Sequence, residues 1–264
     1  MKKFIYTITF LLFITIISGC TESNDDVLKV GMELKWPPFE TVAEDGSPEG
    51  VSVMIAKELG DYLGKEVEIV DLPFSSLIPA LETEQIDLII GSMSITEERK
   101  QSIDFSDSYM YFKILSVVNK ESGITSIDDI FSKEGLVFVA PKSFATLDIA
   151  RNRANNPEIR EFDDKTAASL ELANGNADVF LIDAVGAISI AANYPDNLSV
   201  VYEPVMVYPI GMGIRKSDSD LLEQVNEFIA KSDELGVNER IADSYDDILK
   251  ELVGKGYEFY LNED

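Results

Sequence analysis

The sequence predicts an α/β fold, and three observations support that prediction. Short apolar runs rich in Val, Ile and Leu alternate with longer segments of helical periodicity, which is the pattern of strands covered by helices. This alternation occurs twice between residues 27 and 264. In addition, 45% of the 264 residues are apolar, as in a globular protein, and no low-complexity linker interrupts the pattern. We therefore expect parallel sheets with helices on their faces.

The first occurrence of the pattern runs from residue 27 to residue 119. Its predicted strands are the apolar runs 27–33, 66–71 and 86–92 and the long extended segment 109–119. Its predicted helices are an amphipathic segment that follows Gly50, at 51–64, and a shorter segment at 75–84. Ser94 is followed three residues later by Glu97, which is the spacing of a capping box, so a further helix is expected to begin near Ile95.

The second occurrence fills the rest of the chain. Its predicted strands are 136–140, 158–162, 177–183 and the extended run 198–214. Its predicted helices are 143–154, 165–175, 184–193 and a long final helix at 218–236. The tail, 245–264, is expected to pack a short helix against the first half of the fold.

The first 19 residues are predicted to be a signal peptide rather than part of the fold. A basic start is followed by a 15-residue apolar stretch at 4–18, which is too short for a comfortable membrane span. The segment that ends at Cys20 resembles the lipobox of prokaryotic lipoproteins, in which the cysteine is acylated. Cys20 is the only cysteine, so lipidation is favoured over a plain signal peptide or an uncleaved anchor. Residues 20–26 would form a short tether, and the protein would be extracytoplasmic and lipid-anchored to the cell membrane.

Composition excludes several functional classes. The formal net charge is −26 and becomes −28 once Lys2 and Lys3 are removed with the signal peptide, which argues against nucleic acid as a partner. There is no histidine, so no Ser-His-Asp, Cys-His or His-zinc arrangement can exist. No GxGxxG or GxxxxGK[ST] phosphate loop is present. We therefore predict no catalytic residue, no metal and no cofactor.

The turn after the strand at 86–92 is a candidate anion site. Ser92, Ser94 and Arg99 follow a buried strand, where ligands bind in open α/β sheets. Backbone N–H groups at a helix start attract an anion, and an arginine can grip a carboxylate with two hydrogen bonds. Taken alone, the turn favours a purely structural role slightly: Ser94 could cap a helix and Arg99 could pair with nearby acids.

A larger set of motifs changes that balance. VGMELKWPPFE, PEGVSVMIAKELG, the block from Leu72 to Tyr111 that contains ITEERKQSIDFSD, ADVFLIDAVGA and YPIGMGIRKSDSDLL follow one another in order. Together they resemble the polar amino-acid-binding proteins of ABC importers, the extracellular solute-binding family 3, over residues 27–243. The resemblance implies a type II periplasmic-binding-protein-like fold with two lobes and a hinge of two crossing strands. Lobe 1 would be 27–112 and 210–264, and lobe 2 would be 113–209.

The resemblance also implies site residues. Arg99 matches the arginine that holds the ligand α-carboxylate, and Ser92 and Ser94 match small or hydroxyl residues beside it. Asp183 matches the aspartate that takes the α-ammonium, although it could equally be the N-cap of the helix that follows. Two aromatic residues match those that sandwich the ligand side chain, namely Trp36 and Phe74.

Two further positions bear on the ligand. Glu33 matches an acidic position that contacts the far end of the side chain, which favours a basic or amide amino acid; it could instead be a solvated charge at a strand end. The sequence departs from the family where a Gly-Thr turn is usual, and reads VFVAPKSFAT. Ser143 stands near the glycine position and Phe144 and Ala145 near the hydroxyl ones, with the register uncertain by one residue.

The function expected from the resemblance is capture of an amino acid by a monomeric, membrane-tethered receptor that delivers it to ABC permease subunits. An enzyme on the same fold is an alternative, because some relatives are dehydratases of arogenate-like or prephenate-like acids. The absence of histidine argues against an enzyme. A sensor that presents its closed form to a partner receptor is a third reading, which the sequence does not separate from transport.

Overall fold

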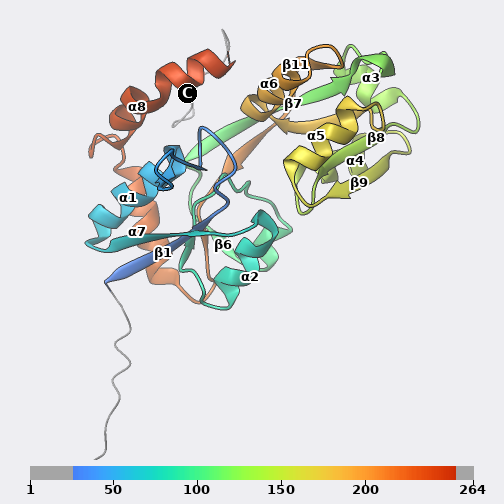
Figure 1. Cartoon of the computed structure of the whole chain (residues 1–264). Coiled ribbons are helices and arrows are strands. Elements are labelled where there is room, and N and C mark those ends of the chain that lie inside the picture. The colour runs from blue at the N-terminus through green and yellow to red at the C-terminus, as the bar shows by residue number, and fades with distance from the viewer. Residues whose placement is uncertain (1–25, 254–264) are drawn as a thin grey trace, which may run out of the picture.

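The computed structural model describes residues 26–253, and the chain there forms two five-stranded sheets linked by long strands (Figure 1). The first sheet has the order β4-β1-β5-β12-β6 and the second the order β11-β7-β10-β8-β9. The strands of the first sheet are β1 (Val27–Met32), β4 (Glu66–Asp71), β5 (Leu88–Ile89), β6 (Asp104–Phe105) and β12 (Gly213–Ile214). Those of the second are β7 (Met110–Asn119), β8 (Val137–Pro141), β9 (Glu158–Phe162), β10 (Val179–Asp183) and β11 (Leu198–Ile210). A two-stranded hairpin is formed by β2 (Thr41–Val42) and β3 (Pro48–Glu49).

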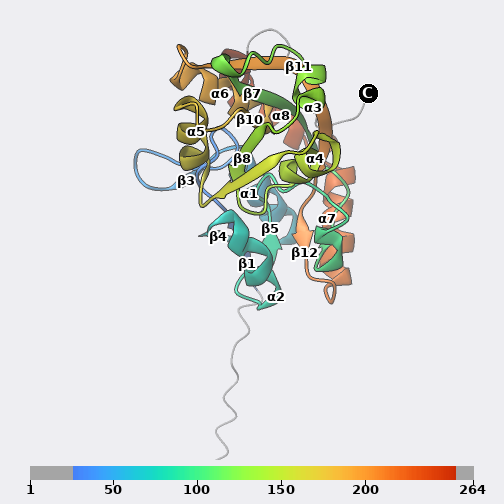
Figure 2. The same ribbon diagram turned by 90° about the vertical axis from the view of Figure 1, so that its right-hand side faces the viewer.

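Helices cover both sheets, as Figures 1 and 2 show. The first sheet is flanked by α1 (Val51–Leu63), α2 (Leu77–Glu82) and α7 (Ser219–Ala230). The second is flanked by α3 (Ile127–Ser132), α4 (Thr146–Arg153), α5 (Lys165–Ala173) and α6 (Ala184–Asn193). Short 3-10 turns lie at η1 (Phe74–Ser76), η2 (Arg99–Gln101) and η3 (Lys120–Ser122). The α/β architecture predicted from the sequence is therefore confirmed.

The sheets are mixed, so the prediction that they are parallel was wrong. β1 pairs in parallel with β4 and β5, and β8 pairs in parallel with β9 and β10, but β7, β11, β12 and β6 run antiparallel to their neighbours. The reason lies in the path of the chain. It leaves the first sheet through β7 and returns through β11, and these two strands pair antiparallel over most of their length. A strand that leaves and a strand that returns must run in opposite directions.

Two features fix the loop that carries the first part of the site, residues 33–40. Leu34 N–H donates to the Asp71 carboxylate at 3.0 Å, and Trp36 and Glu40 close the loop with a backbone bridge. Gly50 then starts α1 with φ of 126°, a conformation that favours glycine. A Cβ atom on Gly50 would lie 2.3 Å from the carbonyl oxygen of Phe39, so only glycine allows α1 to start this close to the loop.

The helix expected near Ile95 does not form. Ile95 N–H donates to the Pro209 carbonyl at 2.9 Å, and Ser94 makes a β-bridge to Ile210, so the chain is held extended against the end of β11. Only the short 3-10 turn η2 follows at Arg99. The helix predicted from the capping-box spacing of Ser94 and Glu97 was therefore wrong.

The C-terminal helices also differ from expectation. The predicted helix 218–236 ends at Ala230, and α8 (Val237–Val253) begins after Gly236, whose φ is +67°. α8 is longer than the short helix expected in the tail, and it packs against α1 and α6 (Figure 1). The predicted signal peptide 1–19, Cys20, all but the last residue of the tether 20–26, and residues 254–264 lie outside the described residues. No helix between residues 26 and 253 is long and apolar enough to cross a membrane.

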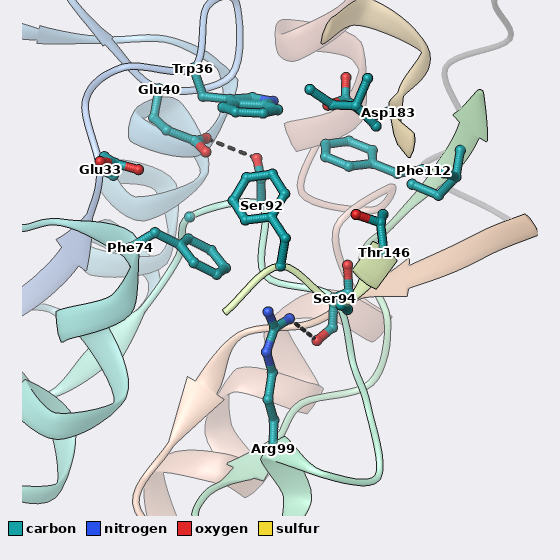
Figure 3. A pocket seen from close by; sticks show the side chains of 15 residues that line it. Glu33, Trp36, Glu40, Phe74, Ser92, Ser94, Arg99, Phe112, Thr146 and Asp183 are labelled. Carbon is teal, nitrogen blue, oxygen red and sulfur yellow. Dashed lines mark hydrogen bonds between the residues drawn. The ribbon is translucent and has the colours of Figure 1, made fainter. Parts of the chain in front are cut away.

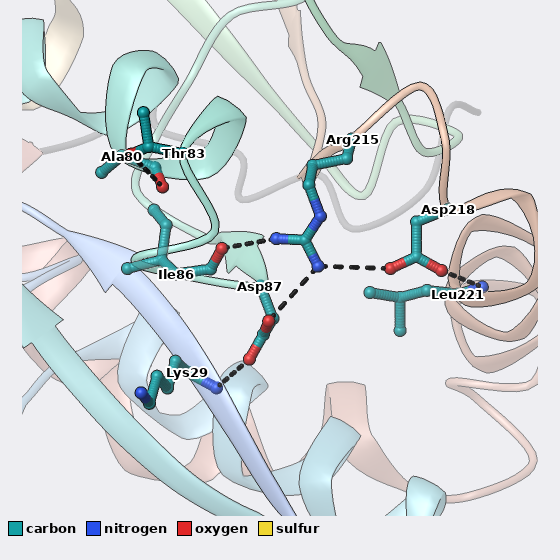
Figure 4. A network of polar contacts seen from close by, with 8 residues as sticks. All are labelled: Lys29, Ala80, Thr83, Ile86, Asp87, Arg215, Asp218 and Leu221. Carbon is teal, nitrogen blue, oxygen red and sulfur yellow. Dashed lines mark hydrogen bonds and ion pairs between the residues drawn. The ribbon is translucent and has the colours of Figure 1, made fainter. Parts of the chain in front are cut away.

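An ion-pair network joins β12 to the rest of the first sheet (Figure 4). The Arg215 guanidinium donates through Nη1 to the Ile86 carbonyl at 2.6 Å and lies 3.3 Å from Asp87 and 3.4 Å from Asp218. Asp87 in turn accepts a hydrogen bond from Lys29 N–H in β1 at 3.0 Å. The network therefore links β1, β5, β12 and the start of α7 near the residues where β1 and β5 begin.

Candidate ligand site between the two sheets

A pocket lies where the two sheets face each other (Figure 3). Fifteen residues from both halves of the fold line it: Glu33, Trp36, Glu40, Phe74, Gly91, Ser92, Ser94, Arg99, Phe112, Ile114, Phe144, Ala145, Thr146, Ile182 and Asp183. Most of the site residues expected from the sequence are among them. Ser143 is the exception. It does not line the pocket, but its backbone carbonyl accepts a hydrogen bond from Arg99.

Arg99 carries a cation into the pocket. Its guanidinium donates through Nη1 to the Ser94 carbonyl at 2.7 Å and through Nη2 to the Ser143 carbonyl at 2.9 Å, and it stands 5.2 Å from the centre of the Phe74 ring. No carboxylate between residues 26 and 253 forms an ion pair with it. Burial lowers the pKa of Arg99 to about 10, so the group stays charged at neutral pH. A buried cation without a counter-ion is a suitable receptor for an anion.

Asp183 carries an anion into the opposite wall. It ends β10 and caps α6, and its Oδ1 accepts a hydrogen bond from Gly186 N–H at 2.8 Å. The side chain is only 5% exposed, and burial raises the pKa of the carboxyl while that capping bond and the charge of Lys165 oppose the rise. Among the described residues it has no ion-pair partner. Asp183 is therefore both the cap of α6 and a residue that lines the pocket, and the sequence allowed for each of these roles.

Thr146 is a site residue that was not predicted. Its hydroxyl is buried against the pocket, the residue is 7% exposed, and Oγ1 has no hydrogen-bond partner among the described residues. It stands at the first position of α4 and lines the pocket, as does Ser94 (Figure 3). The match to the family motif placed the hydroxyl positions near Phe144 and Ala145, with the register uncertain by one residue because the turn has no glycine to fix it. All three residues, Phe144, Ala145 and Thr146, line the pocket. Ser143 takes the left-handed conformation in the place of that glycine, with φ of +66°.

Glu40 is a second residue that was not predicted. Its carboxyl is 2% exposed at the pocket floor, and its Oε2 accepts hydrogen bonds from the hydroxyls of Ser52 at 2.6 Å and Ser92 at 3.1 Å. Burial raises the pKa of Glu40 to about 8, although both hydroxyl bonds oppose that rise. A carboxyl with this pKa is mostly protonated at pH 7. A single glutamate after an aromatic turn gives no sequence signal of such burial.

The aromatic side chains form a row between the halves. The Phe144 ring lies 5.8 Å from that of Trp36 and 5.6 Å from that of Phe74, measured between ring centres. Phe144 thus reaches from the second sheet to both aromatic residues predicted to sandwich a ligand side chain. Glu33 is half-buried at the edge of this row, and burial raises the pKa of its carboxyl.

The arrangement of two α/β lobes around a pocket with a buried cation and a buried anion defines a ligand-binding protein of the two-lobed, type II periplasmic class. Comparison with known proteins gives the family. The model of the bacterial extracellular solute-binding proteins, family 3, matches residues 28–247, and the chain belongs to that family. The family predicted from the sequence motifs is confirmed.

Relatives and solved structures agree with this assignment. The L-cystine-binding protein TcyJ of Escherichia coli is 29% identical over 220 residues, covering 83% of this chain and 82% of the relative. The arginine-binding extracellular protein ArtP of Bacillus subtilis is 27% identical over 91% of this chain and 96% of its own. A putative ABC-transporter binding component of Wolinella succinogenes, solved with lysine, superposes with a TM-score of 0.73 at 27% identity, covering 88% of this chain and 97% of that one.

Proposed function

We propose that this protein is a receptor that captures a polar L-amino acid between its lobes and delivers it to an ABC importer. One observation carries the proposal: the half-buried Arg99 and the buried Asp183 line the same pocket, and neither has an ion-pair partner among the described residues. Burying an unpaired charge is costly. A cation and an anion held in one pocket therefore favour a ligand that has both a negative and a positive group. A zwitterionic amino-acid head group has that charge pattern.

The pose follows from the chemistry of each side chain. The ligand α-carboxylate would bind the Arg99 guanidinium, the free hydroxyl of Thr146 and the Ser94 side of the pocket. The α-ammonium would bind Asp183. The side chain would then extend towards the aromatic row of Trp36, Phe74 and Phe144.

A basic or amide side chain suits the far end of the pocket. The carboxylate of Glu33 can accept hydrogen bonds from a guanidinium, an ammonium or an amide, and the Trp36 ring offers a face to a cation. The relatives support this class in part, since proteins that bind arginine and lysine are among them.

Binding and closure would be coupled. We place lobe 1 at 27–112 and 210–264 and lobe 2 at 113–209, so that Arg99 and Asp183 stand on different lobes. A ligand held by Arg99 binds the closed form better than the open one, because Asp183 and the turn at Ser143 engage only on closure. β7 and β11 would be the hinge. The protein is expected to act as a monomer, held at the membrane by a lipid on Cys20.

A binding role is favoured over catalysis. One solved relative is an ancestral amino-acid-binding protein described as a precursor of cyclohexadienyl dehydratase, 28% identical with a TM-score of 0.72. The charges of Arg99 and Asp183 in the present pocket complement a zwitterion, which supports binding.

Thermal melts against the common amino acids test the proposal. A ligand at a thousandfold excess over its Kd stabilises the native state by about 4 kcal/mol, which gives an easily measured rise in Tm. A rise with lysine, arginine or glutamine is expected, and turnover of an arogenate-like acid by the purified protein is not. If no amino acid raised Tm, the assignment of an amino-acid ligand would be wrong.

A further inference from the structure

A second cavity opens directly outside the pocket. It shares Glu33, Trp36, Phe74 and Phe144 with the inner pocket and is closed on its other side by the start of α5. The row of Trp36 and Phe144 rings therefore separates an inner space, next to Arg99 and Asp183, from an outer one. A ligand side chain that passes this row enters the outer cavity.

Three lysines line that outer cavity, namely Lys35, Lys142 and Lys165, and of these Lys165 is the partly buried one. Its Nζ lies 3.8 Å from the centre of the Trp36 ring, and the side chain is partly buried. Among the described residues the ammonium forms no hydrogen bond and no ion pair. Lys165 is also the first residue of α5, where the helix dipole disfavours a positive charge. Neither local helix stability nor a salt bridge explains why a lysine stands here.

Glu33 faces the same space from the other lobe. Burial lowers the pKa of the Lys165 ammonium, and the carboxyl groups of Asp183, Glu40 and Glu33, in that order of strength, oppose that drop. Once a ligand ammonium neutralises Asp183, Glu33 remains as the acceptor and Lys165 as the donor next to the Trp36 ring. The other charged residues that line this cavity are all exposed, namely Lys35, Lys142, Asp163 and Asp164. The two half-buried charged groups that the far end of a ligand side chain meets are therefore one that only accepts hydrogen bonds, Glu33, and one that only donates them, Lys165.

Three kinds of side-chain terminus can be compared at this pair. An ammonium or guanidinium satisfies Glu33 but lies against a second cation, Lys165. A carboxylate satisfies Lys165 but lies against the Glu33 carboxylate. A primary amide satisfies both, because its NH₂ donates to Glu33 and its oxygen accepts from Lys165.

We propose that Lys165 and Glu33 form a distal subsite that selects a side chain ending in a primary amide, and that Lys165 is the residue that disfavours cationic side chains. The proposal rests on the function proposed above and narrows its ligand class. In this proposal Lys165 determines which ligand side chain is preferred and does not contribute to the affinity for the α-amino and α-carboxyl groups.

Isothermal titration calorimetry with glutamine, arginine, glutamate and alanine tests the subsite. Alanine reports on the head group alone. The wild type should bind glutamine at least about tenfold more tightly than arginine or glutamate, since one charge-assisted hydrogen bond has that magnitude. Lys165→Met should weaken glutamine about tenfold, strengthen arginine by a similar factor and leave alanine unchanged. Lys165→Gln, which keeps a polar side chain, should reproduce the gain for arginine.

Lys142→Met is the matched control. Lys142 lines the same cavity, but its side chain is exposed and its ammonium is paired with Asp163 at 2.6 Å. The proposal is overturned if the ratio of arginine to glutamine affinity is the same in Lys165→Met and in the wild type, if Lys142→Met changes it as much, or if glutamate binds more tightly than glutamine. If alanine or arginine binds but the ratio of arginine to glutamine affinity is the same in Lys165→Met as in the wild type, the distal subsite alone is overturned and the receptor function stands. Failure of all four ligands to bind the wild type would overturn the receptor function and the subsite together.

Discussion

The Nη2 atom of Arg99 lies 2.9 Å from the carbonyl oxygen of Ser143, so the cation of one half of the fold is held by the backbone of the other. Arg99→Ala should weaken binding of any carboxylate ligand at least about a hundredfold, because a bidentate, charge-assisted contact is lost. Arg99→Lys should recover little, since an ammonium cannot form the planar two-bond contact. Calorimetry measures the loss. Lys100→Ala, which removes an exposed neighbour paired with Glu97, should bind like the wild type.

Thr146→Val should raise the free energy of unfolding and lower the ligand affinity. The Thr146 hydroxyl has no partner in the described part of the chain, so its replacement by a methyl group removes an unsatisfied polar atom and should raise the free energy of unfolding by about 1 kcal/mol. Ligand affinity should fall about tenfold if that hydroxyl binds the carboxylate. Thr83→Val is the control, because the Thr83 hydroxyl already donates to the Pro79 carbonyl. Unchanged affinity in Thr146→Val would place this hydroxyl outside the binding site.

Asp183→Asn and Asp183→Ala should have different effects. Asparagine also accepts the Gly186 N–H bond at the start of α6, so this variant should keep its stability and lose about a hundredfold in affinity for an ammonium-bearing ligand. Alanine should lose the cap as well, at a further cost of about 1 kcal/mol in the free energy of unfolding. Asp218→Asn changes another capping aspartate, far from the pocket, and should not affect binding. Equal affinity in Asp183→Asn and the wild type would contradict the role of the charge.

Glu40 should make the protein less stable as pH rises. The pKa of its carboxyl is about 8 in the folded protein, against the ordinary value of 4.5 that it takes once the chain unfolds, so unfolding between pH 4.5 and pH 8 releases a proton. The stabilisation from the neutral carboxyl is complete below pH 4.5 and is lost as pH rises through 8, with a slope of up to about 1.4 kcal/mol per pH unit. Glu40→Gln removes this contribution.

Chemical denaturation between pH 5 and 8 measures the difference. The advantage of Glu40→Gln over the wild type should grow with pH, whereas Glu44→Gln, at an exposed position, should run parallel to the wild type. Parallel curves for Glu40→Gln would show that Glu40 ionises normally.

Arg215→Met should destabilise the first lobe without changing affinity. The guanidinium is only 17% exposed and joins the Ile86 carbonyl to Asp87 and Asp218, so its removal deprives all three of this donor. We expect a loss of about 1–3 kcal/mol in the free energy of unfolding. Lys216→Met, next in the chain and exposed, is the control. A loss of ligand affinity in Arg215→Met would mean that this network acts on the pocket.

Elements with a strong local pattern could be predicted from the sequence. α6 and β9 begin and end where they were predicted, because a polar cap or a turn marks each boundary. Arg99 and Asp183 could be proposed for the site because their charges stand at strand ends in the order of a known family, and they line one pocket.

Other features depend on contacts between distant segments. The helix expected at Ile95 is absent because Pro209 and Ile210 hold that segment extended, and no local signal reports such pairing. The burial of Glu40 depends on its contact with Ser52 in α1 and with Ser92 after β5. Thr146 was missed because the turn that leads to α4 has Ser143 where a glycine was expected, so its register could not be counted from sequence.

The position of α8 has a consequence for the motion of the lobes. This helix touches α1 beside the first sheet and α6 beside the second, and it therefore forms a third link beside β7 and β11. Under the proposed lobe closure, the lobes cannot separate by bending the two strands alone, because α8 must also slide along or detach from α6. The height of the barrier to ligand release would then be set in part by a helix that never touches the ligand.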